Sequence, residues 1–161
     1  MGKEILLFRS FEQAEREAVE AGGKLHRVGP GHTFLQVGSK NTSLFIVITG
    51  SVRVTRPGAE HETELARLSS GALFGELSFL DGSRTSASVV AVEPTEVLEL
   101  GHDTLDRMME QHPALAAKLW RNLAIELKGR LIRTNELVDH YVDLAQVLRD
   151  NPGYADILGV I

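Results

Sequence analysis

The segment that decides the fold runs from Phe74 to Val89 and reads FGELSFLDGSRTSASV. Its pattern predicts a turn at Gly75, one short helical turn, a second loop and then a strand. The N–H groups that open such a turn, together with its dipole, attract an anion. Glu76 offers a carboxylate suited to a sugar hydroxyl, and Arg84 offers a guanidinium suited to a phosphate. The segment therefore indicates an anion site beside a sugar acceptor.

Two further segments extend the pattern toward the N-terminus. Residues 44–54 read LFIVITGSVRV, and residues 65–76 read LARLSSGALFGE. In this order, the three segments resemble the cyclic nucleotide-binding domain family, over roughly residues 5 to 150. In that family the first segment forms paired strands around a glycine turn, and the second feeds a phosphate-binding cassette. The resemblance implies a mainly β fold with flanking helices: an antiparallel β-barrel of the jelly-roll, or double-stranded β-helix, type, followed by a long C-terminal helix.

The resemblance also implies a function. The chain would be a regulatory sensor with cyclic AMP or cyclic GMP as ligand and no cofactor. We also expect that it is not an enzyme, because the sequence offers no nucleophile–base or metal constellation. Glu76 would accept from the ribose hydroxyl, backbone amides of the cassette would hold the cyclic phosphate, and an apolar wall would lie beneath the base. The binding residues implied in this way are Val54, Leu65, Gly75, Glu76, Leu77, Arg84, Thr85, Ser86 and Ala87.

One position departs from the family pattern and leaves an alternative open. The family's phosphate arginine falls at Thr85, and the proline that often precedes it falls at Arg84. Neighbouring residues of an extended segment point to opposite faces, so Arg84 either swings into the site or faces solvent. Glu76 has a plainer interpretation too, as a carboxylate capping a helical turn. The second hypothesis is therefore a fold that has lost its ligand and serves in dimerisation or in binding an unidentified protein partner.

Composition excludes several classes of function. The chain has 161 residues, 43% of them hydrophobic, which suits one domain with or without an extension. Its net charge of −5 argues against a general nucleic-acid-binding surface. The absence of cysteine excludes disulfides, thiolate zinc sites and cysteine nucleophiles. The six histidines are scattered, which argues against a metal site. No apolar run approaches the ~20 residues that span a bilayer, and no secretory signal is apparent, so a cytoplasmic protein is expected.

The chain divides by its local patterns into three parts. Residues 1–112 would hold a helix over Ser10 to Ala21 with Ser10 as its N-cap, the barrel, and a short helix from His102 to Gln111. Within the barrel, Val52 and Val54 alternate with polar residues as in a half-buried strand. Residues 113–150 would form the long helix, and residues 151–161 a tail. That tail is too short for the DNA-reading domain found in some members of the family, so no direct contact with nucleic acid is expected.

The long helix carries an apolar stripe that one barrel is too small to cover. Pro113 suits its first turn, and Asn151 to Gly153 would end it. The turns through Leu123 are expected to pack on the barrel, whereas the later ones are expected to pair with a second copy in a homodimer. The stripe consists of Leu115, Leu119, Leu123, Leu127, Leu131, Val138, Val142, Ala145 and Leu148.

Overall fold

The computed structural model describes residues 5–58 and 61–150 of the chain. Contacts divide the described residues into two units, one ending at Asn122 and the other beginning at Leu123. The elements, in chain order, are η1 (Leu6–Phe8), α1 (Gln13–Gly22), β1 (Lys24–Val28), β2 (Thr33–Leu35), β3 (Ser43–Thr49), β4 (Ser51–Pro57), β5 (Glu62–Ser69), β6 (Leu73–Phe74), α2 (Glu76–Asp81), β7 (Ser88–Ala91), β8 (Thr95–Gly101), α3 (His102–Gln111) and α4 (Pro113–Asp150).

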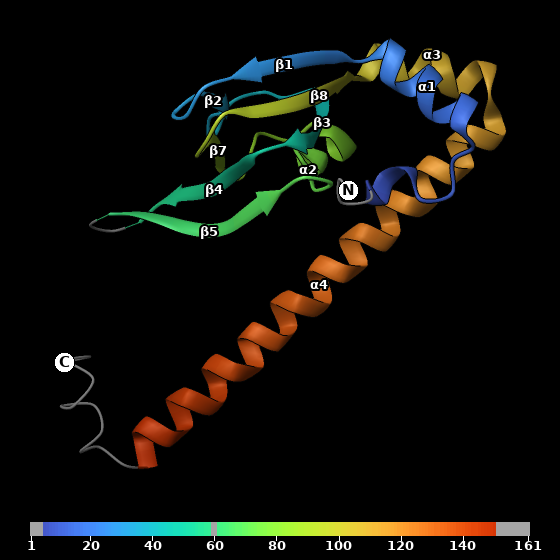
Figure 1. Ribbon diagram of the computed structural model, residues 1–161. Helices are drawn as coiled ribbons and strands as arrows, with labels where there is room; N and C mark the ends of the chain where they lie inside the picture. The colour runs from blue at the N-terminus through green and yellow to red at the C-terminus, as the bar shows by residue number, and fades with distance from the viewer. Residues whose placement is uncertain (1–4, 59–60, 151–161) are drawn as a thin grey trace. The chain divides into compact units, whose positions relative to one another are not determined.

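The strands of the first unit form two antiparallel four-stranded sheets (Figure 1). One sheet has the order β1-β8-β3-β6 and the other the order β2-β7-β4-β5. A cluster of buried apolar side chains draws on both sheets, and the rings of Phe45 and Phe74 stack in it at 5.0 Å between centroids. The predicted mainly β fold with flanking helices and a long C-terminal helix is confirmed. The cluster consists of Leu35, Phe45, Val47, Val52, Phe74, Val89 and Val97.

The turn at Gly50 corrects one detail of the sequence-based prediction. The two strands that flank it, β3 and β4, do not pair with each other, because β3 pairs with β6 and β8, whereas β4 pairs with β5 and β7. Gly50 has a φ of 80°, and a Cβ there would lie 2.5 Å from the carbonyl oxygen of Pro94. The glycine therefore turns the chain from one sheet to the other, where a side chain does not fit.

Strand β4 follows the expected alternation at Val52, which is buried, and at Val54, which packs against the apolar cluster. Thr55 was expected on the exposed face, but it is also buried, and its hydroxyl donates to Glu62 Oε1 at 2.6 Å. Opposite this point β5 has a bulge, because Val54 pairs with Ala66 and Thr55 with Glu64. Leu65 is the extra residue between them.

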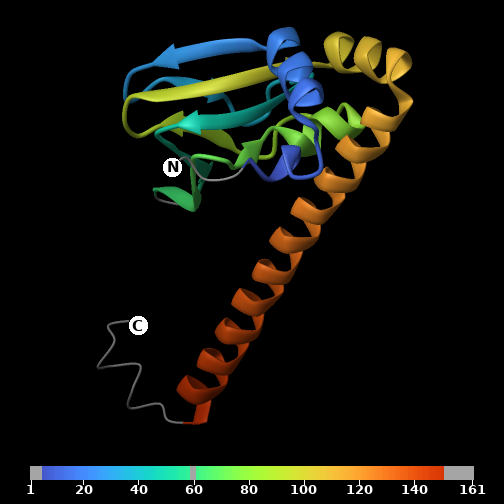
Figure 2. The same ribbon diagram turned by 45° about the vertical axis from the view of Figure 1, so that its right-hand side comes forward.

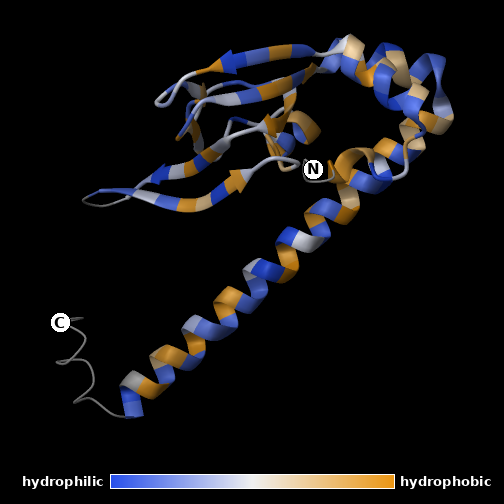
Figure 3. Ribbon diagram, in the orientation of Figure 1, coloured by the Kyte–Doolittle hydropathy of each residue, from blue (hydrophilic) through white to orange (hydrophobic). Residues whose placement is uncertain are grey.

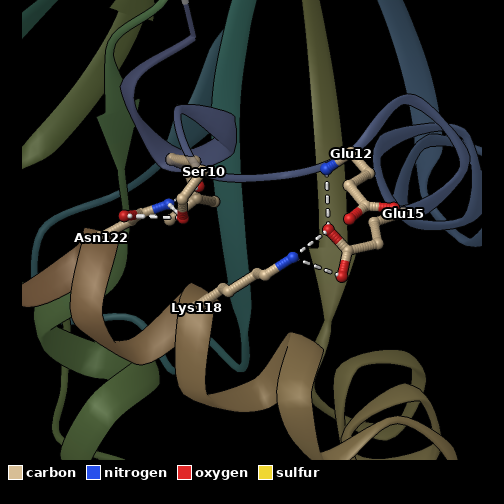
Figure 4. Close-up of polar contacts among 6 residues, drawn as sticks. Ser10, Glu12, Glu15, Lys118 and Asn122 are labelled. Atoms are coloured by element: carbon tan, nitrogen blue, oxygen red, sulfur yellow. Dashed lines mark hydrogen bonds and ion pairs between the residues drawn. The ribbon is translucent and has the colours of Figure 1, made fainter.

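The helix near the N-terminus begins later than predicted. Glu12, not Ser10, is the N-cap of α1, and it forms a capping box with Glu15. The predicted cap at Ser10 is wrong because the Ser10 hydroxyl is taken by Asn122, whose Nδ2 donates to it at 3.0 Å (Figure 4). Glu15 also accepts from Lys118 Nζ at 2.7 Å, and this contact ties α1 to the first turns of α4.

The helices of the first unit pack on one another beyond the sheets. Helix α1 lies beside α3, where a Cβ on Gly22 would lie 3.0 Å from the side chain of Thr104 (Figure 2). Pro113 begins α4, as predicted, and Leu115 and Leu119 are buried within the first unit. No helix among the described residues combines the length and the apolar character that crossing a membrane requires.

The second unit consists of the rest of α4, which runs on through Gly129 to Asp150 without a break. Bands of apolar residues recur along it (Figure 3). Large apolar side chains are exposed there in the single chain, including Leu131, Val138 and Tyr141. Their exposure agrees with the prediction that this part has no core of its own to cover it. The expected helix end at 151–153 and the tail lie outside the described residues.

Candidate functional site

The candidate site begins where β6 ends and α2 starts. Gly75 occupies the N-cap position of α2 with a φ of 80°, and a Cβ there would lie 3.0 Å from both the Phe45 ring and the Ser43 carbonyl oxygen. Glycine thus allows the backbone to lie directly against β3. Glu76 follows as the first residue of α2 and is only 5% exposed. The structure therefore places a carboxylate-bearing residue in a buried position at the start of this segment.

A side chain from another loop fixes the start of the segment. Asn41 is buried, and its Nδ2 donates to the carbonyl oxygens of Ser43 at 2.8 Å and of Gly75 at 3.2 Å, and to Ser78 Oγ at 3.0 Å. Its Oδ1 accepts from the Ser43 amide at 3.1 Å. Sequence reasoning missed this residue. The signal was an asparagine two residues before a serine, the spacing of an Asx turn.

The loop after α2 is closed by its own residues. Gly82 ends the helix with a φ of 69°, and the Ser83 amide donates to Asp81 Oδ1 at 2.8 Å. The hydrogen bonds from the Ser83 side chain and amide lower the pKa of Asp81 below its ordinary value. Asp81 therefore stays ionised at neutral pH and holds the loop after α2 through Ser83. Glu76, in contrast, is the acidic residue of the segment that is buried.

Thr85 fixes the end of the segment. Its side chain is turned into the protein, with the residue 6% exposed, and its hydroxyl donates to the Gln36 carbonyl oxygen at 2.5 Å. The Ser39 amide donates to the same hydroxyl at 3.1 Å. Backbone hydrogen bonds join Thr85 to Gly38 and Ser39 as well. Because its hydroxyl proton is donated to Gln36, Thr85 fixes the end of the segment to the loop between β2 and β3.

Arg84 lies on the outside of that same loop. The residue is exposed, and its Nη1 donates to the Gly38 carbonyl oxygen at 2.7 Å. Its backbone forms an isolated antiparallel bridge with Lys40. Of the two orientations that the sequence left open, the structure has the guanidinium at the surface, bonded to the loop.

The next two residues present backbone donors. Ser86 is exposed and Ala87 is buried, directly before β7 begins. Within residues 5–58 and 61–150, neither amide has a hydrogen-bond acceptor in the fold. The Ser86 carbonyl oxygen accepts from Arg56 Nε at 3.0 Å. Two consecutive N–H groups of this kind suit an anion.

The expected apolar wall is only partly formed by the predicted residues. Val54 is half-buried and lies opposite Val89 of β7, two residues beyond Ala87. Leu65 is 50% exposed at the bulge of β5, and Leu77 is exposed on α2. The two sheet strands thus bring Val54 close to the Ser86–Ala87 end of the segment, and the side chain of Leu77 faces outward.

The predicted residues are brought together through one loop. Residues 36–41 hold the start of the segment through Asn41 and its end through the contacts of Gln36, Gly38 and Ser39 with Thr85. The structure thereby connects Gly75 and Glu76 with Ser86 and Ala87. In the part of the chain that the structure describes, no group of three or more potential metal-ligating side chains occurs.

Comparisons with known proteins agree on one family. The profile described as "Cyclic nucleotide-binding domain" matches residues 25–112, more than half of the chain. The Cyclic AMP receptor protein of Thermus thermophilus is 39% identical over 103 residues, which cover 63% of this chain and 45% of that protein. Glutaminase 1 of Bradyrhizobium diazoefficiens is 37% identical over 109 residues, covering 68% of this chain and 17% of the glutaminase. The chain thus spans less than half of either relative.

Solved structures give the same result. The Catabolite Activator Protein of Thermus thermophilus is similar with a TM-score of 0.70 and 30% identity, over 83% of this chain and 63% of that one. A cyclic nucleotide-binding domain from Methylobacillus flagellatus is similar with a TM-score of 0.76 and 26% identity, over 81% of this chain and 74% of that one.

Proposed function

The chain belongs to the cyclic nucleotide-binding domain family, a family of regulatory modules, and from that premise we propose that it binds a cyclic mononucleotide such as cyclic AMP or cyclic GMP. The ligand would occupy the segment from Gly75 to Ala87 and the face of β4 that carries Val54. The chain would act by binding and not by catalysis. The observation that carries the proposal is the pair of adjacent amides at Ser86 and Ala87, which have no acceptor among the described residues.

Those amides are suited to a cyclic phosphate for a physical reason. Ala87 is buried, and a buried N–H group without an acceptor is costly unless water or a ligand bonds it. Ser86 is exposed, so its amide is open to a ligand that arrives from solvent. A phosphodiester has one negative charge and oxygens that accept from both amides. Thr85 supports a role of these amides in phosphate binding, because its hydrogen bonds to Gln36 and Ser39 hold the backbone in place before any ligand arrives.

Glu76 would recognise the ribose of the same ligand. Glu76 is buried and begins α2, at the end of the segment that Asn41 fixes. The amides of Ser86 and Ala87 lie at the other end, which Thr85 fixes. A carboxylate at the position of Glu76 accepts a hydrogen bond from a sugar hydroxyl, which distinguishes a ribonucleotide from its deoxy analogue.

The second part of the proposal is coupling through a homodimer. Beyond Leu123, helix α4 exposes Leu131, Val138 and Tyr141, and a second copy of the helix is the simplest partner that would cover them. A ligand that prefers one arrangement of the paired helices would shift the population toward it, which is how binding would be transmitted.

Titration calorimetry tests the proposal directly. The natural chain should bind at least one of cyclic AMP, cyclic GMP, cyclic CMP and cyclic UMP with a Kd below about 1 mM, equivalent to roughly −4 kcal/mol or better. The 2′-deoxy analogue of the same nucleotide should bind more weakly, because Glu76 loses its partner. The absence of heat with all four nucleotides at millimolar concentration, together with an unchanged melting temperature, would remove the proposal.

The position of Thr85 favours one alternative, a module that keeps the fold without the ligand. The residue at the family's arginine position is uncharged, and its hydroxyl is used by the Gln36 carbonyl oxygen. Such a module would act through a protein partner or through dimerisation alone.

The variant Thr85→Arg distinguishes the two functions. If the natural chain binds no cyclic nucleotide and the variant does, the alternative is correct. If the natural chain binds, the variant should gain little affinity or lose some, because it also loses the hydrogen bonds of the Thr85 hydroxyl with Gln36 and Ser39. Melting curves of both chains show whether a loss of affinity reflects unfolding.

A further inference from the structure

We propose that Arg56, at the end of β4, supplies the guanidinium that holds the ligand's phosphate. The inference rests on the proposed function and assigns the positive charge that neither Thr85 nor the outward-facing Arg84 provides. It identifies the ligand class more narrowly, as a nucleotide whose phosphate carries a single negative charge at this point.

The first observation is the strand face on which Arg56 lies. Side chains alternate along a strand, so Val52, Val54 and Arg56 share one face of β4. Val52 is buried and Val54 packs against the apolar cluster, so this face points toward the interior of the barrel. The pairing of β4 with β7 is regular from Val52 to Thr55, and the extra residue of the bulge opposite Thr55 belongs to β5, so the alternation along β4 itself is kept. Arg56 is exposed and thus lies where this inward face opens to solvent.

The second observation is the hydrogen bond that Arg56 makes. Thr55 pairs with Ser88 across the ladder, so the next position places Arg56 opposite Ala87. Arg56 Nε donates to the Ser86 carbonyl oxygen at 3.0 Å, which fixes the guanidinium beside the amides of Ser86 and Ala87. A guanidinium has five N–H donors, and this bond uses one of them. No acceptor in the described part of the chain bonds Nη1 or Nη2, so their donors can bind phosphate oxygens.

The third observation is the surroundings of the neighbouring arginines. Arg84 donates to the Gly38 carbonyl oxygen, and Arg53 Nη2 lies 3.7 Å from Glu62 Oε2. Unlike Arg53, Arg56 has no carboxylate partner: among residues 5–58 and 61–150, no carboxylate lies within 4.0 Å of its guanidinium nitrogens. Its positive charge is therefore not neutralised by a described carboxylate, and together with two amides it matches one phosphodiester charge.

The test compares a nucleotide with the same molecule lacking the phosphate. Arg56→Gln should weaken the binding of cyclic AMP (or of the cyclic nucleotide that the natural chain prefers) by at least tenfold, as expected for a charge-assisted hydrogen bond. Its affinity for the corresponding nucleoside should be unchanged. The matched control, Arg84→Gln, removes the same charge two residues before Ser86 and should change neither affinity more than about twofold.

The outcomes separate this inference from the proposed function. If the natural chain binds nothing, the proposed function fails and Arg56 has no phosphate to hold. If the natural chain binds and Arg56→Gln binds equally well, or if Arg84→Gln shows the loss instead, the assignment of Arg56 alone is wrong. If Arg56→Gln weakens nucleotide and nucleoside alike, Arg56 only orders the Ser86 loop, and the assignment is again wrong. Arg56→Lys, which keeps the charge, should recover part of the affinity.

Discussion

Replacing Gly50 with alanine should lower the free energy of unfolding by about 3 kcal/mol. The residue has a φ of 80°, and a left-handed conformation costs a residue with a Cβ roughly 1–2 kcal/mol. The added atom would also lie 2.5 Å from the Pro94 carbonyl oxygen and 2.6 Å from Thr95 Oγ1. Thr95 is buried and donates to the Glu93 carbonyl oxygen at 2.7 Å, so moving it endangers that bond.

Gly31→Ala is the matched control for this prediction. Gly31 has a φ of 85°, close to that of Gly50, but a Cβ there meets no atom within 4 Å. Gly31→Ala should therefore lower the free energy of unfolding only by the cost of the left-handed backbone conformation, about 1 kcal/mol. Urea unfolding at one protein concentration measures both variants. Equal losses would contradict the account, because they would show that the corner between the two sheets tolerates a side chain.

The corner also matters for the ligand site. It sets the start of β4, the strand that carries Val54 toward the apolar cluster and Arg56 toward Ser86. A displaced corner would therefore disturb the proposed phosphate site as well as the core.

Replacing Val138 with lysine should weaken the homodimer about 100-fold or more, equivalent to roughly 3 kcal/mol. Leu131, Val138 and Ala145 follow one another at intervals of seven, and Tyr141 lies three residues after Val138. This is the a and d spacing of a coiled coil, in which Val138 would be an a residue facing its copy. Because both copies carry the change, two charges would be buried at one level of the seam.

Gln146→Lys is the control on the same helix. Gln146 is exposed and falls at a b position of that repeat, outside the seam, so the same added charge should leave the dimer nearly unchanged. Sedimentation equilibrium on the natural chain and both variants gives the dissociation constants. A natural chain that is monomeric at high micromolar concentration would contradict the homodimer. Unfolding of the barrel by Val138→Lys would show that the residue belongs to a core within the chain.

The sequence predicted features that depend on local pattern. The turn at Gly75, the short helix after it, the strand from Val89 and the start of α4 at Pro113 all follow from glycine, proline and apolar periodicity. The jelly roll followed from the resemblance to the family. The cap at Ser10 was wrong because a partner 112 residues away, Asn122, bonds its hydroxyl.

The candidate site was harder to predict, because its parts depend on long-range pairing. The Thr85 hydroxyl bonds Gln36, 49 residues earlier in the chain, and Arg56 reaches the Ser86 carbonyl across 30 residues. No local pattern in a single sequence states which loop lies against which. The partition of β3 and β4 between two sheets is a further example, because adjacent strands around a glycine usually form a hairpin.

The central claim, that a phosphate lies on the amides of Ser86 and Ala87, is tested most directly by nuclear magnetic resonance. In a ¹⁵N-labelled natural chain, the amide signals of these two residues should move as cyclic nucleotide is added, and their titration curves should give the same Kd as calorimetry. Adenosine should leave both signals in place if cyclic AMP is the ligand. If the two signals stay fixed while the nucleotide binds elsewhere, or while nothing binds at all, the claim is contradicted.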